Sequence, residues 1–250
     1  RDRLVHAGVP PEKIATRPLV VTYMCCKCNL DQAQKKYQKL ILVMEMLGLH
    51  SWEQAFSELY AEARGESADW TDLSKEQNAM YAPAGIDAMG RSILWIKGKP
   101  IRKGGEALAL RSGLLIWLSV HSDTRTMRQG MTCVIDSKTI GDKPTGTERK
   151  MQAAWQTIPL RPQKIFFIGT AMWKRALINV LVTVGQLFTK EKITDRLSFA
   201  SPKDLDAIIP VWSRPAYFGG GDGGLEDITK WCAMRYRDFP VKPEQIGLEH

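Results

Sequence analysis

Three short apolar runs separated by helical stretches constrain the fold of this 250-residue chain most strongly. The runs cover residues 92–96, 131–135 and 164–168, and each has the length and composition of a buried strand. Residues 106–121 and 151–157, which lie between the runs, have helical patterns. Because helical crossovers join parallel neighbours, this order predicts an α/β fold with a sheet that is at least partly parallel.

The first 60 residues differ from the rest, since their apolar side chains follow helical spacing from residue 17 to residue 60. Asn29 or Asp31 is expected to cap a helix that begins near Gln32, and Ser51 is expected to cap the next helix. The apolar stripe of the first of these helices consists of Leu40, Val43, Met44 and Leu47.

A polar stretch over residues 64–79 separates the two patterns. We therefore predict a helical N-terminal domain over residues 1–75, an α/β domain over residues 76–222 and a C-terminal tail over residues 223–250. A last short strand at residues 196–200 and a short helix at residues 202–209 are expected near the end of the α/β domain.

The charge balance favours an anionic partner, because 35 Lys and Arg against 27 Asp and Glu give a net charge of +8. The hydrophobic content of 44% is that of a globular protein, and no apolar stretch is long enough for a membrane span. Nucleic acid is a poor candidate, because Trp95, Phe166 and Phe167 lie in runs that look buried rather than on an exposed stacking surface.

No motif predicts catalysis, a metal or a cofactor. Gly219, Gly221 and Gly224 spell a dinucleotide fingerprint, but too little chain follows them for a βαβ unit. Residues 121–123 have the composition of a catalytic triad, but three consecutive side chains cannot form a relay. The four histidines are scattered singly. We therefore expect a protein that is not an enzyme.

Three of the five cysteines are bunched as Cys25, Cys26 and Cys28. They lack the paired C-x-x-C spacing of a zinc site, and the odd total does not fit a secreted disulfide framework. Small buried residues near a helix junction, or surface thiols, are the simpler interpretations. A reducing, cytoplasmic compartment is expected, with the organelle left open.

The segment over residues 171–188 is apolar around most of its circumference. It is either an ordinary core helix or a helix that covers an apolar ligand cavity or dips into a bilayer interface. Between residues 149 and 190 there are seven basic residues and no acidic one. This asymmetry suits an anionic membrane surface, although a solvated basic face is the alternative.

Several strings along the chain, in order, resemble the CRAL-TRIO lipid-binding family. Residues 85–93 (GIDAMGRSI) are similar to its G-x-D-x-x-G-R-P-V hairpin, and residues 130–136 (GMTCVID) to its central strand. Residues 158–168 (IPLRPQKIFFI) resemble its Y-P-x-R-x-x-x-I-x-x-I segment. Residues 191–197, 205–210 and 217–220 resemble its ending, and residues 27–33 its small helical domain.

The resemblance implies a mixed sheet, flanked by helices, that forms the floor of an apolar cavity closed by a gate helix. The expected lipid-pocket residues are Met131, Cys133, Ile135, Ile158, Leu160, Ile165 and Phe167. Period-2 alternation places Met131, Cys133 and Ile135 on one strand face, with Ile165 and Phe167 on the same face of the neighbouring strand, and puts Asp136 on the opposite face. The expected gate and membrane residues are Trp173, Leu177, Leu181, Val184 and Phe188.

The resemblance also implies a grip on an anionic headgroup, such as a phosphoinositide, by Arg161, Lys192 and Arg196. Plain solvation of these side chains is the alternative. The gate segment departs from the family. Residues 169–171 (Gly-Thr-Ala) stand where the family usually has Asn-Pro, and Val182 and Thr183 stand at the usual Lys-Pro.

The sequence therefore predicts a non-enzymatic lipid-binding or lipid-transfer protein that binds one apolar ligand and docks peripherally on anionic membranes. No cofactor is expected besides the bound lipid. The alternative is a structural subunit that keeps the fold inside a larger assembly, with a collapsed cavity and an apolar patch covered by another protein.

Overall fold

The computed structural model describes residues 1–63, 80–97, 124–136, 157–169, 196–201 and 203–220, together with residues 107, 110, 111, 113, 114, 116 and 117. The predicted polar boundary at residues 64–79 lies outside these residues, as does the predicted helix at residues 151–157 except for its last residue. So do the apolar segment at residues 171–188 and the predicted tail.

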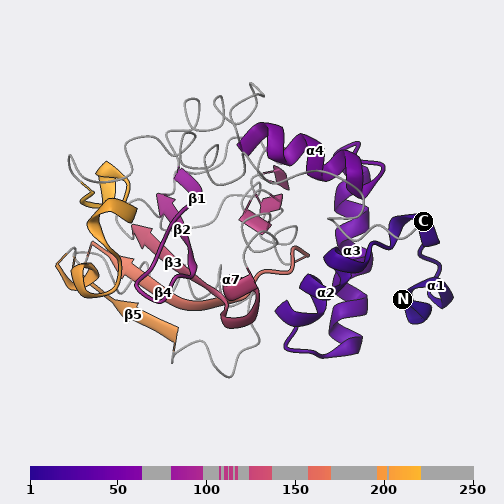
Figure 1. Ribbon diagram of the computed structural model, residues 1–250, viewed down its shortest axis with the longest axis horizontal. Coiled ribbons are helices and arrows are strands. Elements are labelled where there is room, and N and C mark those ends of the chain that lie inside the picture. The colour runs from indigo at the N-terminus through magenta and orange to yellow at the C-terminus, as the bar shows by residue number, and fades with distance from the viewer. Residues whose placement is uncertain are drawn as a thin grey trace.

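The N-terminal part is a set of packed helices (Figure 1). Its helices are α1 (Asp2–His6), α2 (Thr16–Cys25), α3 (Leu30–Met46) and α4 (Trp52–Ala63), with a 3-10 turn at Pro11–Lys13. Asn29 caps α3, because its side chain accepts the backbone N–H of Gln32 at 2.9 Å. Ser51 does the same for α4 by accepting the N–H of Gln54 at 3.0 Å. Both predicted caps are confirmed.

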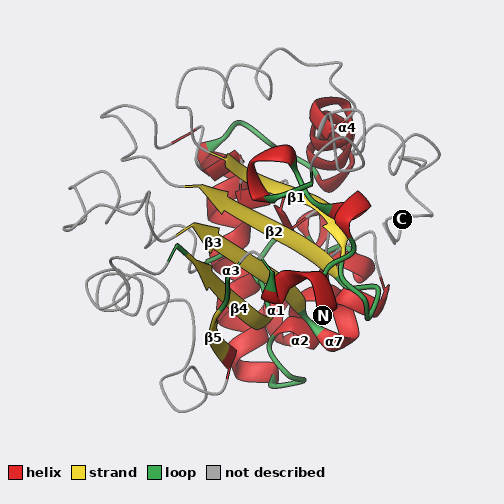
Figure 2. Ribbon diagram, turned by 90° about the vertical axis from the view of Figure 1, so that its left-hand side faces the viewer, coloured by secondary structure: helices red, strands yellow, loops and turns green. Residues whose placement is uncertain are grey.

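A five-stranded mixed sheet forms the second part, with its strands side by side in chain order (Figure 2). β1 runs antiparallel to β2, and β2 to β5 are mutually parallel. The strands are β1 (Met80–Ile86), β2 (Ser92–Lys97), β3 (Met131–Asp136), β4 (Pro162–Ile168) and β5 (Leu197–Phe199). The mixed α/β architecture with flanking helices agrees with the prediction.

Short helices and 3-10 turns make up the rest of the described structure. Every described position between residues 110 and 117 is helical, as predicted, and α7 (Thr124–Gln129) leads directly into β3. The predicted short helix at residues 202–209 is a 3-10 turn at Asp204–Ala207. Further 3-10 turns follow at Val211–Ser213 and Ala216–Phe218.

The two faces of the sheet pack against different parts of the chain. The inner face, with Cys133 and Ile165, belongs to one buried cluster with the N-terminal helices. Trp117 belongs to the same cluster and packs against α4, because its ring lies 5.6 Å from that of Trp52 and 5.9 Å from that of Phe56. The outer face packs against the C-terminal 3-10 segment, and its buried cluster includes Ile93, Trp95, Val134, Phe166, Leu205, Ile209 and Phe218.

Candidate ligand-binding face and anion-binding edge

The inner face of the sheet collects the side chains that the sequence predicts as the lipid-pocket floor. Strand alternation sends Val134 and Phe166 to the outer cluster, so their neighbours along each strand share the inner cluster. Ile158 also belongs to the inner cluster, and Leu160 packs against it partly buried. The inner-face strand residues are at most 4% exposed and comprise Met131, Cys133, Ile135, Ile165 and Phe167. The predicted shared face is confirmed.

The described residues of this face carry no charged side chain. Its polar atom is the sulfur of Cys133, and burial raises the pKa of this thiol to about 12, so the thiol stays protonated at neutral pH. Contact of such an apolar surface with other apolar groups is favourable because it removes both from water.

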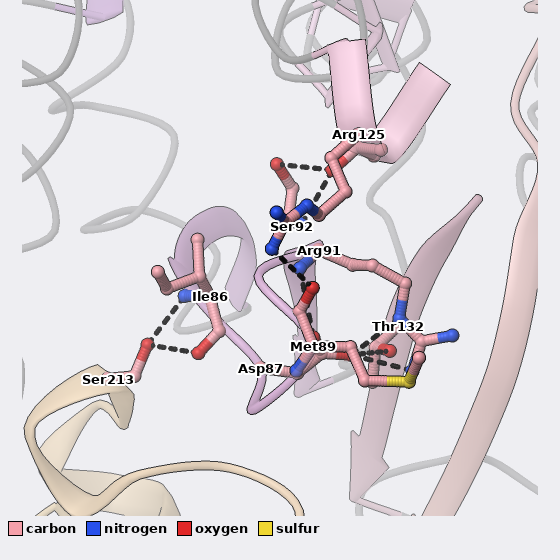
Figure 3. A network of polar contacts seen from close by, with 9 residues as sticks. Ile86, Asp87, Met89, Arg91, Ser92, Arg125, Thr132 and Ser213 are labelled. Atoms are coloured by element: carbon pink, nitrogen blue, oxygen red, sulfur yellow. Dashed lines mark hydrogen bonds and ion pairs between the residues drawn. The ribbon is translucent and has the colours of Figure 1, made fainter. Parts of the chain in front are cut away.

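The hairpin between β1 and β2 fixes the amino ends of β2 and β3 (Figure 3). Asp87, 3% exposed, accepts the backbone N–H of Arg91 at 2.9 Å and the Thr132 hydroxyl at 2.8 Å. The Arg91 guanidinium, itself buried, forms an ion pair with the same carboxylate at 2.7 Å. Because Thr132 belongs to β3, this carboxylate joins the hairpin to the central strand.

The C-terminal 3-10 segment on the outer face is hydrogen-bonded to the same hairpin. The Ser213 hydroxyl accepts the backbone N–H of Ile86 and donates to its carbonyl oxygen, the latter at 2.8 Å (Figure 3). Gly85 has a φ of +79°, and a Cβ on it would lie 2.3 Å from the carbonyl oxygen of Ser213. Glycine is therefore required at the point where the two segments cross.

The amino ends of the parallel strands form a basic edge. Arg161, directly before β4, donates from Nη1 to the carbonyl oxygen of Arg128 in α7 at 2.9 Å. Arg196, directly before β5, donates from Nη1 to the carbonyl oxygen of Pro162 at 2.8 Å. The structure thus brings two of the three predicted headgroup residues to the same end of β4, while Lys192 lies outside the described residues.

Among the described residues, no ion pair joins the basic side chains beside the amino ends of β4 and β5 to an acid. These basic side chains are Arg128, Arg161, Lys164 and Arg196. Two guanidinium groups are held by neutral carbonyl oxygens, and the buried Nε of Arg161 has no hydrogen-bond partner among the described residues. This arrangement favours an anion.

The cysteine-rich turn follows α2, which packs against α7 beside the basic edge. Burial raises the pKa of Cys25 to about 12, and it also raises the pKa of Cys26. Cys28 is exposed. The first two cysteines are therefore buried residues at a helix junction, as the simpler interpretation predicts, and no group of metal ligands occurs among the described residues.

The carboxyl ends of β2 and β3 are closed by the C-terminal segment. The Tyr217 hydroxyl donates to Asp136, and Lys97 lies over the Tyr217 ring at 4.0 Å from its centroid. The hydrogen bond to Asp136 raises the pKa of Tyr217 to about 12. Asp136 belongs to the face opposite Ile135, as predicted, but its partner was not predictable because 81 positions separate the two residues.

Several predicted residues are not placed. The gate residues Trp173, Leu177, Leu181, Val184 and Phe188 lie outside the described residues. No helix in the described ranges is long and apolar enough to cross a membrane. A small cavity beside Trp52 and Glu45 has a volume of about 10 Å³ and is large enough for one water rather than a lipid.

Comparison with known proteins adds no relative, since no protein-family model and no curated protein matches the chain.

Proposed function

We propose that this protein is a non-enzymatic lipid-binding or lipid-transfer protein of the CRAL-TRIO type that docks on anionic membranes. The observation that carries the proposal is the juxtaposition of an uncharged, apolar sheet face with a basic edge at the amino ends of the same strands. An amphiphile with an acyl chain and an anionic headgroup has the complementary pattern.

The apolar part of the ligand lies against the inner face in this proposal. Burial of each CH₂ contributes about 0.8 kcal/mol, so one acyl chain is retained without covalent chemistry. The apolar segment at residues 171–188 acts as the gate over this face.

The anionic headgroup is bound by Arg161, Arg196 and Lys192. The first two support this role because they meet at the start of β4, with no carboxylate within 4 Å of either guanidinium among the described residues. Each cation near an anionic surface contributes about 1 kcal/mol to membrane binding.

The headgroup role is tested with the variant Arg161→Glu/Lys192→Glu/Arg196→Glu. Sedimentation with vesicles of phosphatidylcholine and phosphatidylinositol 4-phosphate is expected to show at least a tenfold loss of affinity. Lys203→Glu, an exposed position on the outer 3-10 segment, is the matched control and should bind nearly as the wild type does. Equal binding of the triple variant and the wild type would remove these residues from the role.

The gate role is tested separately by Leu181→Asp, which places a charge in the apolar segment. We expect this variant to lose its bound lipid when it is extracted and analysed by mass spectrometry, because burial of an unpaired carboxylate is strongly unfavourable. Retention of the normal amount of lipid would show that Leu181 does not seal the ligand.

The second candidate function is a structural subunit that keeps the fold without lipid exchange. The close packing of the inner face favours it, because Met131 and Phe167 are at most 1% exposed and belong to a continuous buried cluster with the N-terminal helices. This candidate predicts a protein without lipid whose apolar surfaces are covered by another subunit.

A further inference from the structure

The outward side of α3 carries a narrow stripe of four residues. Lys35, Lys39, Leu42 and Met46 are spaced by four, three and four positions, so they lie one above another on a helix with 3.6 residues per turn. The stripe is about 17 Å long at 1.5 Å per residue. The opposite side of α3, which includes Tyr37, Leu40 and Met44, is buried in the core.

The apolar half of this stripe is strongly exposed. Met46 is 68% exposed and Leu42 is 57% exposed, and Met46 is the most exposed large hydrophobic side chain among the described residues. A single exposed leucine is ordinary on a protein surface. Two such side chains at i and i+4, in line with two lysines, form instead the amphipathic pattern of helices that bind at a membrane interface.

No ion pair between described residues engages the two lysines of the stripe. The two acidic residues of α3 are engaged elsewhere, since Asp31 pairs with Arg3 at 2.8 Å and Glu45 pairs with Lys13. In the part of the chain that the structure describes, no carboxylate lies within 4 Å of Lys35 or Lys39. The charge of the stripe is therefore complementary to an anionic surface.

We propose that this α3 stripe is a second membrane contact, with Leu42 and Met46 in the boundary between headgroups and acyl chains and the two lysines at lipid phosphates. This contact lies on α3, whereas the contact proposed above lies on the basic edge of the sheet. It rests on one part of the proposed function, namely that the protein docks on anionic membranes. Lysine stems extend to the headgroups while apolar neighbours insert.

The test uses the full chain with two paired variants. Leu42→Gln/Met46→Gln removes the apolar half and Lys35→Gln/Lys39→Gln removes the charge, and glutamine keeps the helix propensity in both. Val211→Gln, which is 47% exposed on the outer 3-10 segment, and Lys203→Gln are the matched controls.

Affinity is measured by sedimentation with vesicles of phosphatidylcholine and phosphatidylserine, and with phosphatidylcholine alone. Each paired variant is expected to bind the mixed vesicles about tenfold more weakly than wild type, whereas the controls keep the wild-type affinity. The defect of the lysine pair should disappear on phosphatidylcholine alone. Circular dichroism confirms that each variant is folded.

Unchanged affinity in both paired variants overturns the α3 contact and leaves an acidic protein as the partner of the stripe. The proposed function survives that outcome if the Arg161, Lys192 and Arg196 variant still binds poorly. Lipid content by mass spectrometry separates the two proposals further, because the α3 variants should retain their lipid. If the wild-type protein does not bind anionic vesicles, both the α3 contact and the proposed membrane docking are wrong.

Discussion

At the scale of single residues, Asp87 determines how the sheet begins. Its buried carboxylate accepts hydrogen bonds from the hairpin backbone, Arg91 and Thr132. Asp87→Ala leaves the Arg91 guanidinium buried without its partner, so we expect the free energy of unfolding to fall by about 3–5 kcal/mol. Urea unfolding followed by circular dichroism measures this change.

The control for that prediction is another aspartate in an ion pair. Asp31 pairs with Arg3 at 2.8 Å, close to the 2.7 Å between Asp87 and Arg91, but both side chains of the Asp31 pair are at least 60% exposed. Asp31→Ala should therefore cost less than about 1 kcal/mol. Equal losses in the two variants would contradict the assignment of Asp87 as the residue that joins hairpin and central strand.

Thiol reactivity gives a second prediction at this scale. Burial raises the pKa of Cys25 and of Cys133 to about 12, whereas Cys28 is exposed. Their thiolate fraction at pH 8 is smaller than that of an ordinary thiol by about a thousandfold. Titration with a disulfide reagent should therefore label Cys28 in the native protein and the other two only after unfolding.

Substitution checks the assignment of the reactive thiol. Cys28→Ser should remove one rapidly reacting thiol, and Cys133→Ser should leave the native count unchanged. If Cys133→Ser instead lowers the number of rapidly reacting thiols by one, the reagent reaches the inner face in the native protein, and this would contradict its burial.

At the scale of elements, the turn between α2 and α3 has the hydrogen bonds of a Schellman motif. The N–H of Cys28 reaches the carbonyl of Tyr23 and that of Lys27 reaches Met24, at 2.9 and 3.0 Å. The position that glycine usually occupies in this motif is Lys27, whose φ is +53°. A lysine in the left-handed region costs free energy that glycine avoids.

Lys27→Gly is therefore expected to raise the free energy of unfolding by about 0.5–1 kcal/mol. Lys35→Gly, in the middle of α3 and on its exposed side, should lower it by about 1 kcal/mol. Thermal unfolding of both variants compares the two effects. A destabilised Lys27→Gly protein would mean that contacts of the lysine side chain outweigh the backbone strain.

The helix caps and the strand faces follow from local sequence, whereas the contacts of the C-terminal segment do not. The caps at Asn29 and Ser51 and the strand alternation around Cys133 were predictable, because each depends on neighbours within a few residues. The bond between Ser213 and Ile86 spans 127 positions, and that between Tyr217 and Asp136 spans 81. No local pattern encodes such pairs, since they form only after the C-terminal segment covers the outer face.

At the scale of the whole molecule, the order of strands explains why the candidate site has two parts. Because β2 to β5 are parallel, their amino ends meet at one edge, and this edge brings Arg161 and Arg196 together. The role of α7 was not predictable from the sequence, because its contribution to Arg161 is a backbone carbonyl oxygen. The shared apolar face of β3 and β4 was predictable, because it follows from alternation within each strand.

The inner face joins the two halves of the chain, since the N-terminal helices and the sheet share one buried cluster. A ligand on this face would therefore stabilise both parts together. The lipid-binding and structural-subunit proposals differ on whether such a ligand exists, and both are consistent with the same strands and helices.

The most direct test of the central proposal is mass spectrometry of the gently purified full-length chain, first under native conditions and then after solvent extraction. The lipid-binding account predicts one lipid per protein, carrying an acyl chain and an anionic headgroup, and predicts that Leu181→Asp removes it. A protein that contains no lipid, and takes up none when membrane lipids are offered, would contradict the account and favour the structural subunit.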